Sequence, residues 1–198
     1  HIFPLPGDSS LLVDLGKTYL TVIAPDGSFQ GGMSMAQMSE DGPPSIIMPE
    51  AVDGLGRIYH QAMSFGAGPS DTIGVSRYDR GTGESETVAT LWRTEPIITR
   101  SGDNVSMSLP RMVANDDYAV GADGRVAVVR ANGYYIEWHM PGGEVVTGPE
   151  TPYEVLPISY ADKEADLTES TGAGLSISVM RNSSGGTQMQ MQRGGSLG

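Results

Sequence analysis

The chain has 198 residues, 38% of them hydrophobic, and 24 acidic residues against 12 basic ones give it a formal net charge of −12. This balance argues against nucleic acid or an anionic membrane surface as partner, because both attract clustered Lys and Arg. The chain has no cysteine, which excludes disulfides, thiolate metal sites and a cysteine nucleophile. No apolar run approaches the roughly 20 residues that cross a bilayer, so we expect no membrane span.

Short stretches of alternating apolar and polar residues dominate the chain, and turn residues interrupt them, including many of its 27 glycines and 13 prolines. A period of two between such turns is typical of β-strands, so the pattern predicts an all-β protein. The best helical candidate is the short, mostly charged segment from Tyr160 to Glu169.

Three segments share one pattern of apolar strands and Asp/Gly turns, in which one strand opens near Gly-Arg or Gly-Lys and another ends at a Pro/Asp/Gly turn. These segments run from Leu11 to Gly27, from Ala51 to Gly83 and from Ala119 to Gly143. Their spacing fits a four-stranded unit of roughly 40 to 50 residues with loop insertions, which is the size of a β-propeller blade. The pattern therefore predicts about three blades.

Known propellers close with about four to eight blades, so three blades leave the ring incomplete. Two solutions stay open: the chain is part of a longer protein, or two chains assemble into one ring. The start at His1 favours the first. We expect blades over residues 1–167, and over residues 168–198 a Gly-, Ser-, Gln- and Met-rich hairpin or flexible tail.

Eight stretches of the chain carry a family resemblance. They are Gly7 to Asp14, Thr21 to Gly27, Asp71 to Ile73, Arg77 to Asp79, Thr87 to Leu91, Ala122 to Trp138, Pro152 to Ile158 and Ala161 to Ala165. Over residues 7–165 the chain resembles uncharacterised bacterial six-bladed β-propeller proteins of the NHL-like or TolB-like type. The resemblance implies blades of a six-bladed ring, and it implies no defined reaction and no catalytic residues.

The last 31 residues also contain an alternating pattern. Leu175, Ile177 and Val179 alternate with serines, while Met189 and Met191 alternate with glutamines. Residues 182–186 form a plausible turn between the two runs. The pattern predicts a hairpin with one apolar face, and a flexible tail is the alternative.

The run Asn115, Asp116 and Asp117 is a candidate calcium site. Carboxylate and amide oxygens are the ligands that Ca²⁺ prefers, and the run precedes a strand that can face the central channel of a propeller. Asp and Asn also stabilise turns by binding their own backbone. Calcium is therefore the alternative to a protein without a cofactor.

Glu137 and His139 form a second candidate metal site, because residues two apart on a strand leave the same face. Tyr135 shares that face, and His60 would have to supply a further donor from another blade. The alternative is a half-exposed strand face. We predict that the other face, with Tyr134, Ile136 and Trp138, packs in the core while Glu137 and His139 face the channel or solvent.

These features favour a non-enzymatic binding or scaffold module, secreted or periplasmic, that presents a broad surface to a protein or a glycan. One alternative is a Ca²⁺-dependent propeller hydrolase of the lactonase type. The other is a structural assembly subunit that pairs through open strand edges, either as a homo-oligomer or with blades from elsewhere in a longer chain.

Overall fold

The structure is a computed structural model, and it describes residues 1–37, 45–64, 71–95, 97–101, 104–108, 112–154, 156–170, 175–181 and 187–193. It is mostly β, as the sequence predicts. The chain divides into two compact units: one contains His1–Thr94 and Met112–Pro152, the other Glu95–Arg111 and Tyr153–Gly198. The sequence boundary at residue 167 stays a prediction.

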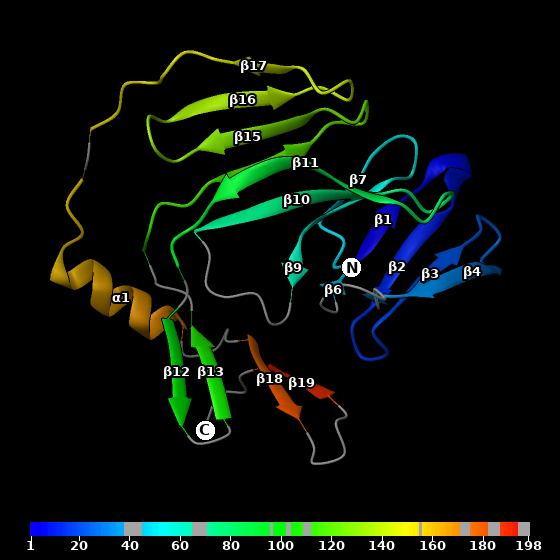
Figure 1. The fold of residues 1–198 in the computed structure, drawn as a ribbon, viewed down its shortest axis with the longest axis horizontal. Coiled ribbons are helices and arrows are strands. Elements are labelled where there is room, and N and C mark those ends of the chain that lie inside the picture. The colour runs from blue at the N-terminus through cyan, green and yellow to red at the C-terminus, as the bar shows by residue number, and fades with distance from the viewer. Residues whose placement is uncertain are drawn as a thin grey trace. The chain divides into compact units, whose positions relative to one another are not determined.

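Three four-stranded antiparallel sheets form most of the first unit (Figure 1). The first sheet contains β1 (Ile2–Pro4), β2 (Ser10–Asp14), β3 (Tyr19–Ile23) and β4 (Phe29–Ser34). The second contains β7 (Ala51–Val52), β8 (Ile58–Gln61), β10 (Thr72–Tyr78) and β11 (Ser85–Trp92). The third contains β14 (Asp117–Val120), β15 (Val126–Arg130), β16 (Tyr135–His139) and β17 (Val145–Thr147). Each of the three sequence repeats lies in one of these sheets.

A smaller sheet of three short strands also belongs to the first unit. It pairs β5 (Ala36–Gln37), β6 (Ser45–Ile46) and β9 (Met63–Ser64). Because β9 joins this small sheet, β8 pairs directly with β10 in the second sheet. All three large sheets therefore keep neighbouring strands in chain order.

Two apolar layers hold the large sheets face to face. Leu11, Val13 and Leu20 of the first sheet share a core with Ile58 and Tyr78 of the second. On the other side of the second sheet, a separate core combines Tyr59, Val75 and Leu91 with Val126 and Val128 of the third sheet. Strand β8 is buried on both faces, since Ile58 and Tyr59 point to opposite layers. The sheets thus stack in chain order, and the described residues show no closed ring.

The turns that join the first and second strands of the three large sheets share one hydrogen bond and one positive φ, although Gly7 adds a second positive φ of 72° in the first turn. In each turn a backbone N–H donates to the carbonyl four residues later: Leu5 to Ser9, Asp53 to Arg57, and Gly121 to Arg125. The fourth residue of each turn has a positive φ, at 57° for Asp8, 80° for Gly56 and 82° for Gly124. Glycine adopts this conformation without strain, which explains two of the three residues. The shared geometry aligns the sheets residue by residue.

The prediction for the faces of β16 is wrong, because the two faces are exchanged. Tyr134, Ile136 and Trp138 are 50%, 40% and 38% exposed. His139 pairs with Val126, and Glu137 pairs with Val128, so these polar side chains share the covered face of the sheet. The period of two separates the faces correctly, but the packing of the neighbouring strand decides which face is covered.

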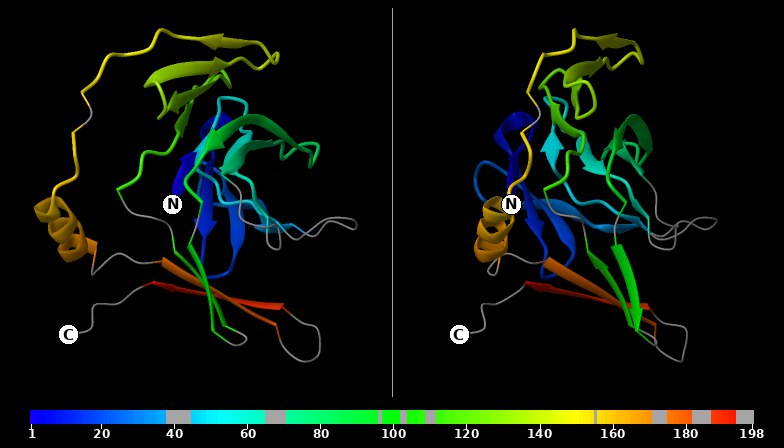
Figure 2. Two further views of the ribbon diagram at one scale, coloured as in Figure 1. Left: turned by 60° about the vertical axis from the view of Figure 1, so that its left-hand side comes forward. Right: turned by 90° about the vertical axis from the view of Figure 1, so that its left-hand side faces the viewer.

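The second unit contains one helix and two hairpins. Helix α1 (Tyr160–Ser170) confirms the predicted helical segment. One hairpin joins β12 (Ile97–Ser101) and β13 (Asn104–Ser108), and the other joins β18 (Leu175–Arg181) and β19 (Thr187–Arg193). Strands β13 and β18 are in contact, and the two hairpins cross in both views of Figure 2. Within the described residues, no helix is long and apolar enough to cross a membrane.

The C-terminal hairpin confirms the prediction from alternation. Ile177 pairs with Met191 and Val179 with Met189, so the apolar residues of the two strands stand opposite each other. The predicted turn at residues 182–186 lies outside the described residues.

Candidate functional site

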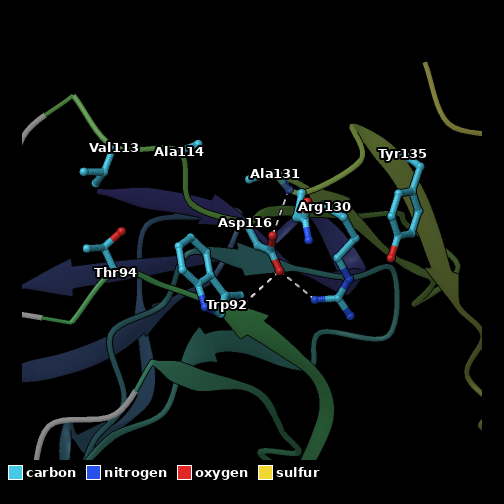
Figure 3. Close-up of a pocket in the computed structure, with 9 residues that line it drawn as sticks. Trp92, Thr94, Val113, Ala114, Asp116, Arg130, Ala131 and Tyr135 are labelled. Carbon is cyan, nitrogen blue, oxygen red and sulfur yellow. Dashed lines mark hydrogen bonds and ion pairs between the residues drawn. The ribbon is translucent and has the colours of Figure 1, made fainter. Parts of the chain in front are cut away.

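A pocket of about 770 Å³ lies in the first unit, beside the end of β11 and the turn between β15 and β16 (Figure 3). Trp92 is the last residue of β11, Arg130 ends β15, and Tyr135 begins β16. Thr94 and Asp116 also line the pocket. The pocket therefore combines two aromatic rings with an acidic and a basic side chain.

Asp116 joins three segments of the pocket through its carboxylate. The Asp116 side chain is only 3% exposed. One oxygen accepts hydrogen bonds from the backbone N–H of Trp92 at 2.8 Å and from Nη1 of Arg130 at 2.7 Å. The other accepts from the backbone N–H of Ala131 at 2.9 Å. Burial acts to raise the pKa of Asp116, but these bonds outweigh it and hold the pKa below 3.8.

Arg130 links Asp116 to Glu137. Its Nε donates to Glu137 Oε2 at 2.8 Å, and its Nη2 donates to the same oxygen. Nη1 also donates to the carbonyl of Thr90 at 2.8 Å. The hydrogen bond from Arg130 is the main reason why the pKa of Glu137 lies below 4.5. One guanidinium thus pairs with two carboxylates, and the three side chains together keep one negative charge.

The two carboxylates of this cluster are poorly suited to act as a general acid or base. A general acid or base works best with a pKa near the operating pH, whereas the pKa values of Asp116 and Glu137 are both lowered. Both carboxylates are also engaged by Arg130. The Trp92 side chain, in contrast, is 43% exposed and lies beside Asp116 in Figure 3. The pocket thus has an exposed indole ring beside a hydrogen-bonded polar cluster.

The three predicted calcium ligands have separate partners in the structure. Asn115 Oδ1 accepts from the backbone N–H of Thr94 at 2.7 Å. Asp116 binds Arg130, and the exposed Asp117 accepts from the backbone N–H of Tyr118 at 2.8 Å. In the described part of the chain no three acidic or histidine side chains gather as a metal site would require. Calcium binding by these residues stays a prediction.

The second predicted pair does come together. His139 Nε2 lies 3.6 Å from Glu137 Oε2, and the Tyr135 hydroxyl donates to Glu137 Oε1 at 3.5 Å. The Glu137 oxygen nearest His139 is the one that accepts from Arg130. His60 lies on β8, where its Nδ1 is 3.1 Å from the carbonyl oxygen of Gln61. Arg130 thus already binds the Glu137 oxygen that a metal ion shared with His139 would use.

Sequence reasoning missed Arg130 and Trp92. For Arg130 a signal was present, because a tight turn after it places Tyr135 opposite Arg130 in the register. Glu137 then lies diagonally across on the same face, within reach of a long side chain. Trp92 and Asp116 carry no such local signal, because they are 24 residues apart along the chain.

A second buried carboxylate, Asp53, has a structural role in the turn before β8. Its side chain is fully buried, and it accepts from Arg57 Nε at 2.7 Å and from the Tyr59 hydroxyl at 3.0 Å. The next residue, Gly54, donates its N–H to the carbonyl of Ala122 at 2.8 Å. Asp53 therefore stabilises the contact between the second and third sheets.

Fold and pocket together define a mostly β protein of stacked antiparallel sheets, with a pocket whose charged groups are paired with one another. Comparison of the sequence with protein-family models and with curated proteins found no match.

The buried His60 predicts a pH dependence of stability. Burial lowers its pKa below 6.5 in the folded protein, despite opposing effects of the Gln61 carbonyl and Glu50. Because the unfolded chain binds this proton more readily, the contribution of His60 is complete above about pH 6.5 and is lost as the pH falls through the folded pKa. We expect lower stability at pH 5.5 than at pH 7.5 in urea denaturation. The His60→Gln variant should show a weaker dependence, and an equal dependence would contradict this assignment.

Proposed function

We propose that the chain is a non-catalytic binding module built on propeller-like blades, and that it takes a neutral glycan in the pocket beside Trp92. The observation that carries the proposal is an exposed indole ring next to charged groups that are already paired. Because these charged groups already bind one another, they are less available to bind a charged ligand. The exposed surface of the pocket includes the Trp92 ring.

The propeller part of the proposal is supported by the way the sheets stack. Three four-stranded sheets follow one another in chain order, and an apolar layer separates each from the next. This is the construction of propeller blades, which cannot bury both faces alone. A closed six-bladed ring and a secreted or periplasmic location belong to the proposal as well.

The ligand class follows from the chemistry of the pocket. A volume of about 770 Å³ lies within the range of small-molecule sites and accommodates a short oligosaccharide. Trp92 and Tyr135 supply aromatic rings, which pack against the C–H faces of a sugar. Thr94 and Asn132 add neutral polar groups for its hydroxyls. Arg130 already binds two carboxylates, which disfavours an anionic ligand.

The test uses the fluorescence of Trp92. The chain has two tryptophans, so Trp138→Phe leaves Trp92 as the sole reporter. We expect a saturable fluorescence change with at least one neutral oligosaccharide of a panel that also contains acidic oligosaccharides and unstructured peptides. By calorimetry, Trp92→Ala should weaken that binding roughly tenfold or more, as the loss of an aromatic contact does. Trp138→Ala is the matched control.

Three outcomes would contradict the proposal. They are binding confined to acidic sugars or to peptides, no binding by any member of the panel, and unchanged affinity in the Trp92→Ala variant. Chelation addresses the Ca²⁺-dependent hydrolase. We expect the same melting temperature and the same glycan affinity before and after EDTA, whereas a fall in either on removal of the ion would favour the hydrolase.

A further inference from the structure

The two end sheets of the stack each have an apolar outer face. On the third sheet, Val129, Ile136 and Val146 are 38%, 40% and 42% exposed, and Trp138 lies among them through its pairing with Val146. The first sheet exposes Ile2, Leu12 and Phe29 on the side away from its core, at 69%, 37% and 66%. Apolar groups gathered on one face commonly mark an interaction surface.

The equivalent turns show that these two faces are of opposite kinds. Leu11, Tyr59 and Ala127 each stand two residues after the end of their turn. Leu11 faces the second sheet and Tyr59 faces the third, so this position points forward to the next sheet. Ala127 pairs with Trp138, which makes the outer face of the third sheet a forward face on which no described sheet of the first unit packs.

The same alignment identifies the backward face. Ile58 and Val126 each follow their turn directly, and each points to the preceding sheet. Their equivalent in the first sheet is Ser10, which lies on the same face as Leu12. Both covered junctions of the stack join a forward face to a backward face. Among the described residues, the three large sheets therefore leave one face of each kind uncovered by a neighbouring sheet of the stack.

We propose that the forward face of the third sheet packs on the backward face of the first sheet of a second copy of this chain. The new junction repeats the two that already exist within the chain. Two copies can form it twice, head to tail, and so cover all four exposed faces. This proposal is independent of the glycan pocket.

The turns supply a charge match at the proposed junction. At the junction of the second and third sheets, the guanidinium of Arg57 occupies the space that a side chain at Gly124 would need. The equivalent of Arg57 in the third sheet is Arg125, which pairs with the half-exposed Asp123 and whose guanidinium lies 5.7 Å from the ring centre of Trp138 on the forward face. The equivalent of Gly124 in the first sheet is the exposed Asp8. The proposed junction thus places Arg125 opposite Asp8 of the second copy.

The first test measures the molar mass of the full chain by light scattering and its dissociation constant by sedimentation, in 0.15 M salt to screen the net negative charge. We expect a dimer. Ile136→Lys on the forward face and Leu12→Lys on the backward face should each raise the dissociation constant roughly tenfold or more, because each places a charge in an apolar junction. Val145→Lys is the matched control. Val145 is 50% exposed but pairs with His139 on the opposite face, so its substitution should leave the dimer intact.

Mixing the two lysine variants tests the head-to-tail geometry. Alone, each variant has both junctions damaged. In a mixed dimer, the intact forward face of the Leu12→Lys chain meets the intact backward face of the Ile136→Lys chain. We therefore expect mixed dimers to form more tightly than dimers of either variant alone. Reversal of the charge by Arg125→Asp should likewise weaken the dimer. Mixing that variant with Asp8→Arg should restore opposite charges at both junctions, one with the native pair and one with the exchanged pair.

The proposal fails if the unaltered chain is a folded monomer with a cooperative melt at the concentrations tested. It also fails if Leu12→Lys leaves the dimer intact, since association of two third sheets face to face would not involve Leu12. Circular dichroism of each variant shows whether the fold is retained. A variant that unfolds is replaced by Val129→Lys or Ile2→Lys, which lie on the same two faces.

Discussion

Replacing Arg130 by methionine is expected to lower the free energy of unfolding by about 3 kcal/mol, near the lower end of the range for breaking a buried ion pair. The substitution leaves Asp116 and Glu137 without their cation, and these side chains are only 3% and 17% exposed. Arg130 itself is 20% exposed, and for this reason we take the lower end. Urea denaturation at pH 7 measures the change.

A comparison with Arg130→Lys separates charge from geometry. Lysine keeps the positive charge but lacks the planar fork that donates to both carboxylates at once, so we expect an intermediate loss. If Arg130→Met cost less than about 1 kcal/mol, water would have to solvate the two carboxylates. The inference that Arg130 stabilises the polar cluster of the pocket would then be wrong.

The second large effect is expected for Asp53→Ala, which should cost about 3 to 5 kcal/mol, as the loss of one member of a buried pair does. The fully buried carboxylate binds the Arg57 guanidinium, the Tyr59 hydroxyl and the backbone N–H groups of Leu55 and Arg57. Its removal leaves the Arg57 guanidinium without its carboxylate and the backbone N–H groups of Leu55 and Arg57 without their acceptor, at the contact between two sheets. Thermal and urea denaturation measure the loss.

Two milder variants define what Asp53 contributes. Tyr59→Phe removes one hydrogen bond to the carboxylate and is expected to cost about 1 kcal/mol. Asp53→Asn keeps an oxygen for the backbone donors but removes the charge that pairs with Arg57, so its cost should lie between those of the other two variants. Equal stability of Asp53→Ala and Tyr59→Phe would show that the ion pair with Arg57 adds nothing.

Features that depend on neighbouring residues were predictable from the sequence. Alternation and turn glycines located the strands of the three repeats, and the same alternation located the hairpin of β18 and β19. The charged segment from Tyr160 to Glu169 was the best helical candidate, and it forms a helix. Side chains that bind their own turn, such as Asp117 with Tyr118, were also foreseen as the alternative to a metal site. All of these interactions span a few residues.

The candidate pocket could not be predicted in the same way. The acidic run 115–117 suggested three ligands for one ion, yet the three side chains point to different partners. Arg130, which binds Asp116, lies 14 residues further along the chain, and the backbone of Trp92 comes from another sheet. Proximity of this kind arises only when sheets pack together.

By itself, the sequence determined the strands, the turns between them and the division of each strand into two faces, because these follow from a period of two and from local backbone preferences. Only the tertiary structure decided which face is covered. In β16 the more apolar face, with Ile136 and Trp138, lies outward, while Glu137 and His139 share the covered side. The physical reason is that Val126 and Val128 pack against the second sheet. The residues paired with them in the register, His139 and Glu137, therefore lie on the same covered face. There Arg130 binds the half-buried Glu137.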